Sequence, residues 1–195
     1  MQRRTKTRGS LAQAALELAA ATPLDDITVT ALAQRAGITR ETFYRHATSV
    51  ADATAAALGE ELRVIQEENS ALPAVSPTGE SVFLKPTRQL VDHVADRAAV
   101  YRHAMQPRLH PRLREVLTAH IGAGLLIHLD AHPEIAPRNG AFARRGLAAY
   151  AAAGTVGVLE EWLAADDPVD RETLTDVILA AAPEWWQGQS HRGRS

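Results

Sequence analysis

The feature that most restricts the fold is a pair of short helical segments separated by a single glycine. Thr28 is a suitable N-cap for a helix over 29–36, and Gly37 is a suitable residue to end it. Thr39 can cap the next helix, which we expect from residue 40 to about residue 46. Two short helices joined by a tight turn that contains glycine are typical of a helix-turn-helix.

The side chains of this segment divide into an apolar set and a hydrogen-bonding set. Leu32, Ile38 and Phe43 are expected to fill a small core, and the small residues Ala33 and Ala36 permit close helix packing. The second helix carries mostly polar side chains, and the free N–H groups at its start favour phosphate. The pattern therefore predicts a helix that can enter a groove of DNA.

Positive charge is concentrated near the N-terminus. Residues 1–50 hold seven Lys and Arg against four Asp and Glu, a balance of +3, so the remainder of a chain of net charge −2 carries −5. This distribution indicates that only the N-terminal part faces phosphate. Four of these cations form either an arm that contacts phosphate or the minor groove, or a disordered tail: Arg3, Arg4, Lys6 and Arg8.

One stretch is specific enough to indicate a family. The run AGIT at 36–39 is followed by TFYRH at 42–46, and residues 28–46 as a whole resemble the DNA-binding signature of the TetR/AcrR family of regulators. Residues 14–18 are similar to the family's first helix. The resemblance implies an all-α fold of about nine helices, with an N-terminal three-helix DNA-binding domain and a C-terminal helical domain for ligand binding and dimerisation.

The resemblance also implies which residues contact DNA. Tyr44 and His46 are expected to bind phosphate, whereas Arg40 reaches either a guanine edge or phosphate. Glu41 and Thr42 are either base readers or solvated surface residues. The full predicted DNA-binding set is Thr28, Thr39, Arg40, Glu41, Thr42, Tyr44, Arg45 and His46.

The sequence departs from the family pattern in three places. Ala47 stands where the family usually has an aromatic residue, Val50 where it often has a lysine, and 22–24 where a glycine is usual. These changes leave the reading helix intact but lower the expected affinity. They also keep open an alternative, in which the chain is a helical ligand-binding or interaction dimer that has lost operator binding.

The remainder of the chain also has helical patterns. Ser49 and Asp52 form a capping box for a long helix to about residue 69, and further helices are expected over 86–103, after Pro111, over 139–165 and over 170–183. Pro168 is expected near the N1 position of the last of these. We predict a DNA-binding domain over 1–48, an effector-binding and dimerisation domain over 49–186, and a disordered tail over 187–195.

The resemblance implies two further sites. Residues 80–135 would enclose a pocket for a small-molecule effector that releases a repressor from a palindromic operator, and the last two helices would pair two subunits. The candidate pocket residues are Phe83, Val94, Tyr101, Met105, Ile121, Leu125 and His128. The candidate dimer residues are Leu147, Tyr150, Gly154, Val158, Trp162, Leu174, Val177 and Ile178.

Several other classes of protein are disfavoured. The chain has no cysteine, and its histidines pair on predicted helices at separations of 10 (His93 and His103) and 8 (His120 and His128), not at the four that suits a shared metal. We therefore predict no metal and no cofactor. There is no phosphate-binding loop or nucleophile motif, so we predict no enzyme activity. Neither a secretory signal nor a membrane span is evident, and we expect a cytoplasmic protein.

Overall fold

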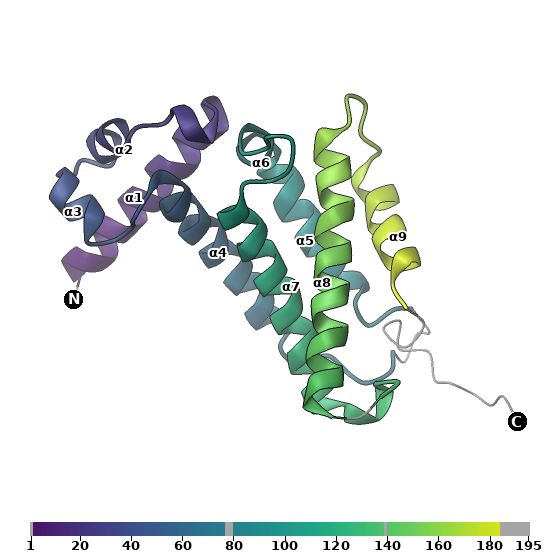
Figure 1. Cartoon of the computed structure of the whole chain (residues 1–195). Helices are drawn as coiled ribbons and strands as arrows, with labels where there is room; N and C mark the ends of the chain where they lie inside the picture. Colours follow the sequence, from purple (N-terminus) through teal and green to yellow (C-terminus); the bar gives the residue numbers. More distant parts are fainter. Residues whose placement is uncertain (1, 77–79, 139, 184–195) are drawn as a thin grey trace, which may run out of the picture. The chain divides into compact units, whose positions relative to one another are not determined.

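The computed structural model describes residues 2–76, 80–138 and 140–183, with residues 2–6 described by their backbone alone. The regular structure of these residues is helical. These residues contain nine α-helices, two 3₁₀ turns and no β-strand, as the family resemblance predicted (Figure 1). No helix among them is long and apolar enough to cross a membrane. The helices are α1 (Gln2–Ala21), α2 (Val29–Arg35), α3 (Arg40–Tyr44), α4 (Val50–Glu68), α5 (Leu84–Asp96), α6 (Ala98–His103), α7 (Pro111–Ala131), α8 (Ala141–Ala164) and α9 (Arg171–Ala181).

The chain divides into two compact units. The first holds the residues up to Glu61 together with Arg97–Val116, and the second holds Leu62–Asp96 and the residues from Leu117 onward. Helices α4 and α7 each contribute residues to both units. These units are defined by contacts and do not test the functional domains, whose boundaries at residues 48 and 186 remain a prediction. The predicted tail over 187–195 lies outside the described residues.

The core of the first unit lies where α1 packs against α2 and α6. Leu32 and Phe43 are fully buried there, as predicted, whereas Ile38 is only partly buried. Helix α1 begins at Gln2, so the predicted N-terminal arm is helical in its backbone, while the side chains of Arg3, Arg4 and Lys6 lie outside the described residues.

The predicted helix over 86–103 is wrong, because the chain leaves the helical path at Arg97. This residue has φ −104° and ψ 16° and separates α5 from α6. Its guanidinium donates two hydrogen bonds to Glu61, at 3.1 and 2.6 Å, and these hold the break in place. The start of the last helix also differs from the prediction: Asp170 is the N-cap, accepting from the N–H of Thr173 at 2.8 Å, and Pro168 precedes the helix.

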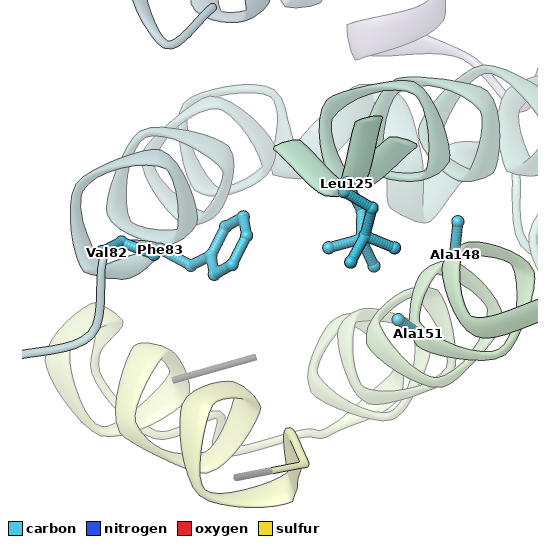
Figure 2. Packing of buried hydrophobic residues seen from close by; sticks show 6 residues of the cluster. Val82, Phe83, Leu125, Ala148 and Ala151 are labelled. Carbon is cyan, nitrogen blue, oxygen red and sulfur yellow. The ribbon is translucent and has the colours of Figure 1, made fainter. Parts of the chain in front are cut away.

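The second unit is built on contacts between α5 and α9 and on the α8–α9 hairpin, whose two helices run antiparallel (Figure 1). Arg171 at the start of α9 bonds Asp92 at 3.1 Å and Asp96 at 2.6 Å, and these carboxylates raise the pKa of its guanidinium. Apolar side chains fill the centre: Phe83, before α5, and Leu125, on α7, lie with Ala148 and Ala151, on α8, in one buried cluster (Figure 2).

His128 is an unusual member of this core. Its ring is 3% exposed, and neither ring nitrogen has a hydrogen-bond partner among the described residues. It packs edge-on against the ring of Phe83, with ring centres 4.9 Å apart, and at a tilt against the ring of His132, with ring centres 5.0 Å apart. Burial, reinforced by His132 and opposed by the carboxylate of Glu134, lowers the pKa of His128 to about 4. The neutral form of the ring is therefore the form that the fold accommodates.

This burial makes the stability of the protein depend on pH. The unfolded chain takes up a proton at His128 near pH 6.5, but the folded chain does so only near pH 4. The free energy of unfolding should fall as pH is lowered between these values, by at most about 1.4 kcal/mol per pH unit from this group. Urea titrations of wild type and His128→Phe at several pH values measure the difference. Parallel pH profiles for the two proteins would contradict the prediction.

Candidate nucleic-acid interface and effector cavity

The turn between α2 and α3 is set by one residue in the left-handed region. Gly37 has φ +66°, and the backbone closes a Schellman motif: the N–H of Ile38 donates to Ala33 O at 2.9 Å, and that of Gly37 donates to Gln34 O at 3.1 Å. An L-residue pays a steric cost at this φ, so the glycine that the sequence singled out is required by the backbone.

The start of α3 is held by a short chain of hydrogen bonds. Thr39 accepts from the N–H of Thr42 at 3.1 Å and donates to the Thr42 hydroxyl at 3.0 Å. Arg45 donates to the same hydroxyl at 2.9 Å. Three of the predicted DNA-binding residues are thus brought together in one network, which fixes the short helix and satisfies an N–H at its start.

Other predicted DNA-binding side chains are open to solvent. Arg40, Glu41 and Tyr44 are exposed on α3, and none has a hydrogen bond or ion pair with another described residue. The Tyr44 ring is 53% exposed and meets the edge of the buried Phe43 ring at 5.3 Å. The remaining two predicted residues lie at the ends of helices. Thr28 caps α2 by accepting from the N–H of Ala31 at 3.1 Å, and His46 is half-buried just after α3.

A cluster of polar groups ties α2 to α1. Arg35 on α2 pairs with Glu17 on α1: its Nε, at 2.9 Å, and its Nη2 both donate to Oε2, while Gln13 donates to Oε1 at 2.7 Å. The bond from Gln13 and then that from Arg35 lower the pKa of Glu17. Arg35 was counted in the basic N-terminal segment, but the fold pairs this cation with a carboxylate.

The start of α4 is organised around Asp52. Ser49 accepts from the Asp52 N–H at 3.0 Å, which confirms half of the predicted capping box. The Asp52 carboxylate accepts from the N–H and hydroxyl of Thr48 at 3.0 and 3.1 Å, and from Arg112 on α7 at 2.7 Å. The backbone bond from Thr48 is the largest cause, and Arg112 the next, of a lowered pKa of Asp52. No local pattern in the sequence indicates that Arg112 joins this site.

The two departures from the family pattern at this point are both buried. Ala47 is 5% exposed and Val50 is 7% exposed. Val50 therefore contributes to the core of the first unit. Unlike a lysine at this position, valine has no charged group that could bind a phosphate.

A cavity lies within the second unit, among residues of α4, α5, α7, α8 and α9. The space between its walls is about 570 Å³, which includes the part open to solvent. Three predicted pocket residues line it: Phe83, Ile121 and Leu125. The other lining residues are Ile65, Gln66, Asn69, Leu72, Pro86, Thr87, Leu90, His120, Gly124, Thr155 and Ile178.

The other predicted pocket residues lie elsewhere. Val94 is fully buried in the second unit, and His128 packs behind Phe83 without lining the cavity. Tyr101 and Met105 belong to the first unit. The prediction missed the α4 wall, although Leu62, Ile65, Gln66 and Asn69 follow the i, i+3, i+4, i+7 spacing of one helix face.

The predicted dimer residues divide by exposure. On α8, Tyr150 is 75% exposed and Gly154 is exposed, and on α9 Val177 is 47% exposed. Leu174 and Ile178, at 2% and 5%, point into the core of their own unit. The remaining three, Leu147, Val158 and Trp162, are partly buried. Phe142 was not among the predicted residues, yet it is 83% exposed near the start of α8.

The fold and the exposed α3 define a class: an all-helical protein with an N-terminal helix-turn-helix for DNA. Residues 11–52 match the sequence model of the family described as bacterial regulatory proteins, tetR family. The match identifies residues 11–52 as a DNA-binding segment of the tetR type, and solved TetR-family regulators share the all-helical fold of the chain. No curated protein matches the sequence significantly.

Solved structures share the fold at low sequence identity. One is the Thermus thermophilus FadR, a TetR-family transcriptional repressor in complex with lauroyl-CoA, with a TM-score of 0.68, 19% identity, and coverage of 95% of this chain and 96% of that one. The fatty acid degradation regulator FadR from Bacillus halodurans has a TM-score of 0.61, 16% identity, and coverage of 95% and 97%. A tetR-family regulator from Streptomyces coelicolor has a TM-score of 0.60, 16% identity, and coverage of 89% and 78%.

The turn geometry predicts opposite effects for two glycine substitutions. Gly37→Ala should lower the free energy of unfolding by about 1–2 kcal/mol, because alanine resists a positive φ. Gly9→Ala, within α1 and with open space around the added methyl, should be neutral or raise it by up to about 1 kcal/mol. Urea unfolding followed by circular dichroism measures both. Equal effects of the two substitutions would show that the turn at Gly37 is not strained.

Proposed function

We propose that this regulator binds a (pseudo)palindromic operator as a homodimer, with one α3 in the major groove at each half-site. The observation that carries the proposal is the set of exposed side chains on α3, namely Arg40, Glu41 and Tyr44, none of which is paired with another described residue. The Thr39–Thr42–Arg45 network supports it, since a fixed helix start orients these side chains at low entropic cost. Half-site centres should lie about 34–36 Å apart or somewhat more.

The proposed dimer interface is the exposed face of α8 with the adjoining part of α9. Phe142, Gly146, Tyr150 and Gly154 recur along α8 at a spacing of four and are all exposed. Large exposed aromatic side chains beside glycines suit a helix-packing surface, because the small residues permit close approach of a second helix. Val177 on α9 extends the same kind of surface.

The proposed regulation is release of a repressor by a small molecule that enters the cavity of the second unit. Helix α4 begins just after the helix-turn-helix, and near its end it supplies Ile65 and Gln66 to the cavity wall, with Asn69 directly after it. A ligand that favours one position of α4 would therefore change the affinity for DNA, and DNA would change the affinity for the ligand by the same factor. In this proposal the protein acts in the cytoplasm without metal, cofactor or enzymatic activity, and the functional division is 1–48 for DNA and 49–186 for effector and dimer.

A second function merits a test because of Val50. Its aliphatic side chain cannot make the phosphate contact that family members often make with a lysine there. In this alternative the chain is a ligand-binding or interaction dimer that has lost its operator. It predicts ordinary dimerisation without sequence-selective binding to DNA.

Substitutions on α3 distinguish the two functions. Arg40→Ala and Tyr44→Ala should each weaken binding to the protein's own upstream intergenic DNA about tenfold or more, as expected when a DNA contact worth about 1–3 kcal/mol is removed. Arg63→Ala, which removes an exposed arginine paired with Glu67 in the second unit, should leave affinity unchanged. Gel shifts at two salt concentrations measure this. Wild-type binding no tighter than to random DNA, there and in a selected library, would favour the alternative.

A charge on the exposed face of α8 tests the dimer. Tyr150→Glu should convert the dimer to monomer at micromolar concentration, because a carboxylate would be buried without a partner at the interface. Val64→Glu places the same charge at an exposed apolar position of α4 and should leave the dimer intact. Light scattering after size exclusion gives the mass. A Tyr150→Glu protein that remains dimeric would place the interface elsewhere.

A further inference from the structure

Asn69 is one of the residues that line the cavity, and its side chain carries a buried hydrogen-bond acceptor. The residue is 9% exposed, and its Nδ2 donates to Ile65 O at 2.7 Å and to Gln89 Oε1 at 2.6 Å. Both partners are acceptors, so they fix which end of the amide is nitrogen. The other end, Oδ1, is buried and has no hydrogen-bond partner among the described residues. A buried carbonyl oxygen without a donor is costly, and a ligand that supplies the donor would remove that cost.

The other polar groups of the wall are also neutral. Gln66, Thr87, His120 and Thr155 line the cavity, and none of its described lining residues is Asp, Glu, Lys or Arg. Burial lowers the pKa of His120, which keeps the ring uncharged near neutral pH. The remaining lining residues are aliphatic or aromatic, apart from Gly124 and Pro86. A charged group in this cavity would therefore lose its hydration without gaining an ion pair.

We propose that the effector of this cavity is an uncharged, largely apolar molecule that carries a hydroxyl or N–H group, and that this group donates a hydrogen bond to Asn69 Oδ1. The proposal rests on the proposed role of the cavity as the effector site. Two features of the cavity would make it specific: one unpaired hydrogen-bond acceptor, and walls whose described residues carry no charge. Such a site selects against acids and cations through desolvation, and against donor-free analogues through the unpaired acceptor.

The uncharged walls of this cavity do not suit the ligand that is bound in one solved structure of the same fold. The Thermus thermophilus FadR structure holds lauroyl-CoA, whose phosphates are anionic. Among the described residues that line the cavity of this chain, there is no Lys or Arg that could pair with such a group.

The test compares three probes with the same apolar chain: 1-decanol, decanoate and methyl decyl ether. Full-length wild-type protein is titrated with each by calorimetry, and operator binding is measured in the same samples. We expect 1-decanol to bind at least tenfold more tightly than either decanoate or the ether. In Asn69→Leu the advantage of the alcohol over the ether should disappear. Gln89→Leu is the matched control, because it removes the same Asn69–Gln89 bond but leaves Oδ1 in place, and it should keep the advantage.

Each outcome has a defined meaning. Decanoate binding as tightly as the alcohol, or an alcohol preference over the ether that survives in Asn69→Leu, would overturn the proposal. Failure of all three probes to bind a protein that still binds its operator would also overturn it, while leaving the regulator function in place. Loss of operator binding by the wild-type protein itself would instead count against the proposed function on which this inference rests.

Discussion

The DNA-binding part of the structure depends on the hydrogen bonds that the carboxylate of Asp52 accepts. It accepts from Thr48, at the end of the helix-turn-helix, and from Arg112, at the start of α7, while the Asp52 N–H is held by Ser49. One side chain thus joins the end of the helix-turn-helix to the beginnings of the two helices, α4 and α7, that also supply residues to the cavity of the second unit. Several hydrogen bonds to one carboxylate favour its charged form, which is why its pKa lies below the usual range.

The helix-turn-helix could be predicted closely because its determinants are local. Gly37 must adopt a positive φ, and Thr28, Thr39 and Ser49 each cap a helix that begins at the next residue. Each of these features depends on a few adjacent residues, and each is present in the structure. The break at Arg97 could not be predicted in the same way, because it depends on an ion pair with Glu61, which is 36 residues away in the sequence.

The cavity of the second unit was even harder to predict from local sequence. The family resemblance implied a pocket within residues 80–135, and of its candidate residues Phe83, Ile121 and Leu125 line the cavity whereas Val94 and Tyr101 are buried core residues. The polar groups that give the cavity its character come from separate helices: Asn69 follows α4, Thr87 lies on α5, His120 on α7 and Thr155 on α8. Nothing local marks them as neighbours, and the unpaired oxygen of Asn69 becomes visible only when its partners Ile65 and Gln89 are in place.

Selection of bound duplexes from a random-sequence DNA library tests the central claim most directly, because the operator sequence need not be known beforehand. If α3 reads DNA in a dimer, the selected duplexes should contain an inverted repeat whose half-site centres lie about 34–36 Å apart or somewhat more, with binding that weakens as salt is raised. An enriched repeat that the Arg40→Ala protein fails to select would assign the reading to α3. Recovery of no preferred sequence by the wild-type protein would contradict this claim and leave a helical ligand-binding dimer in its place.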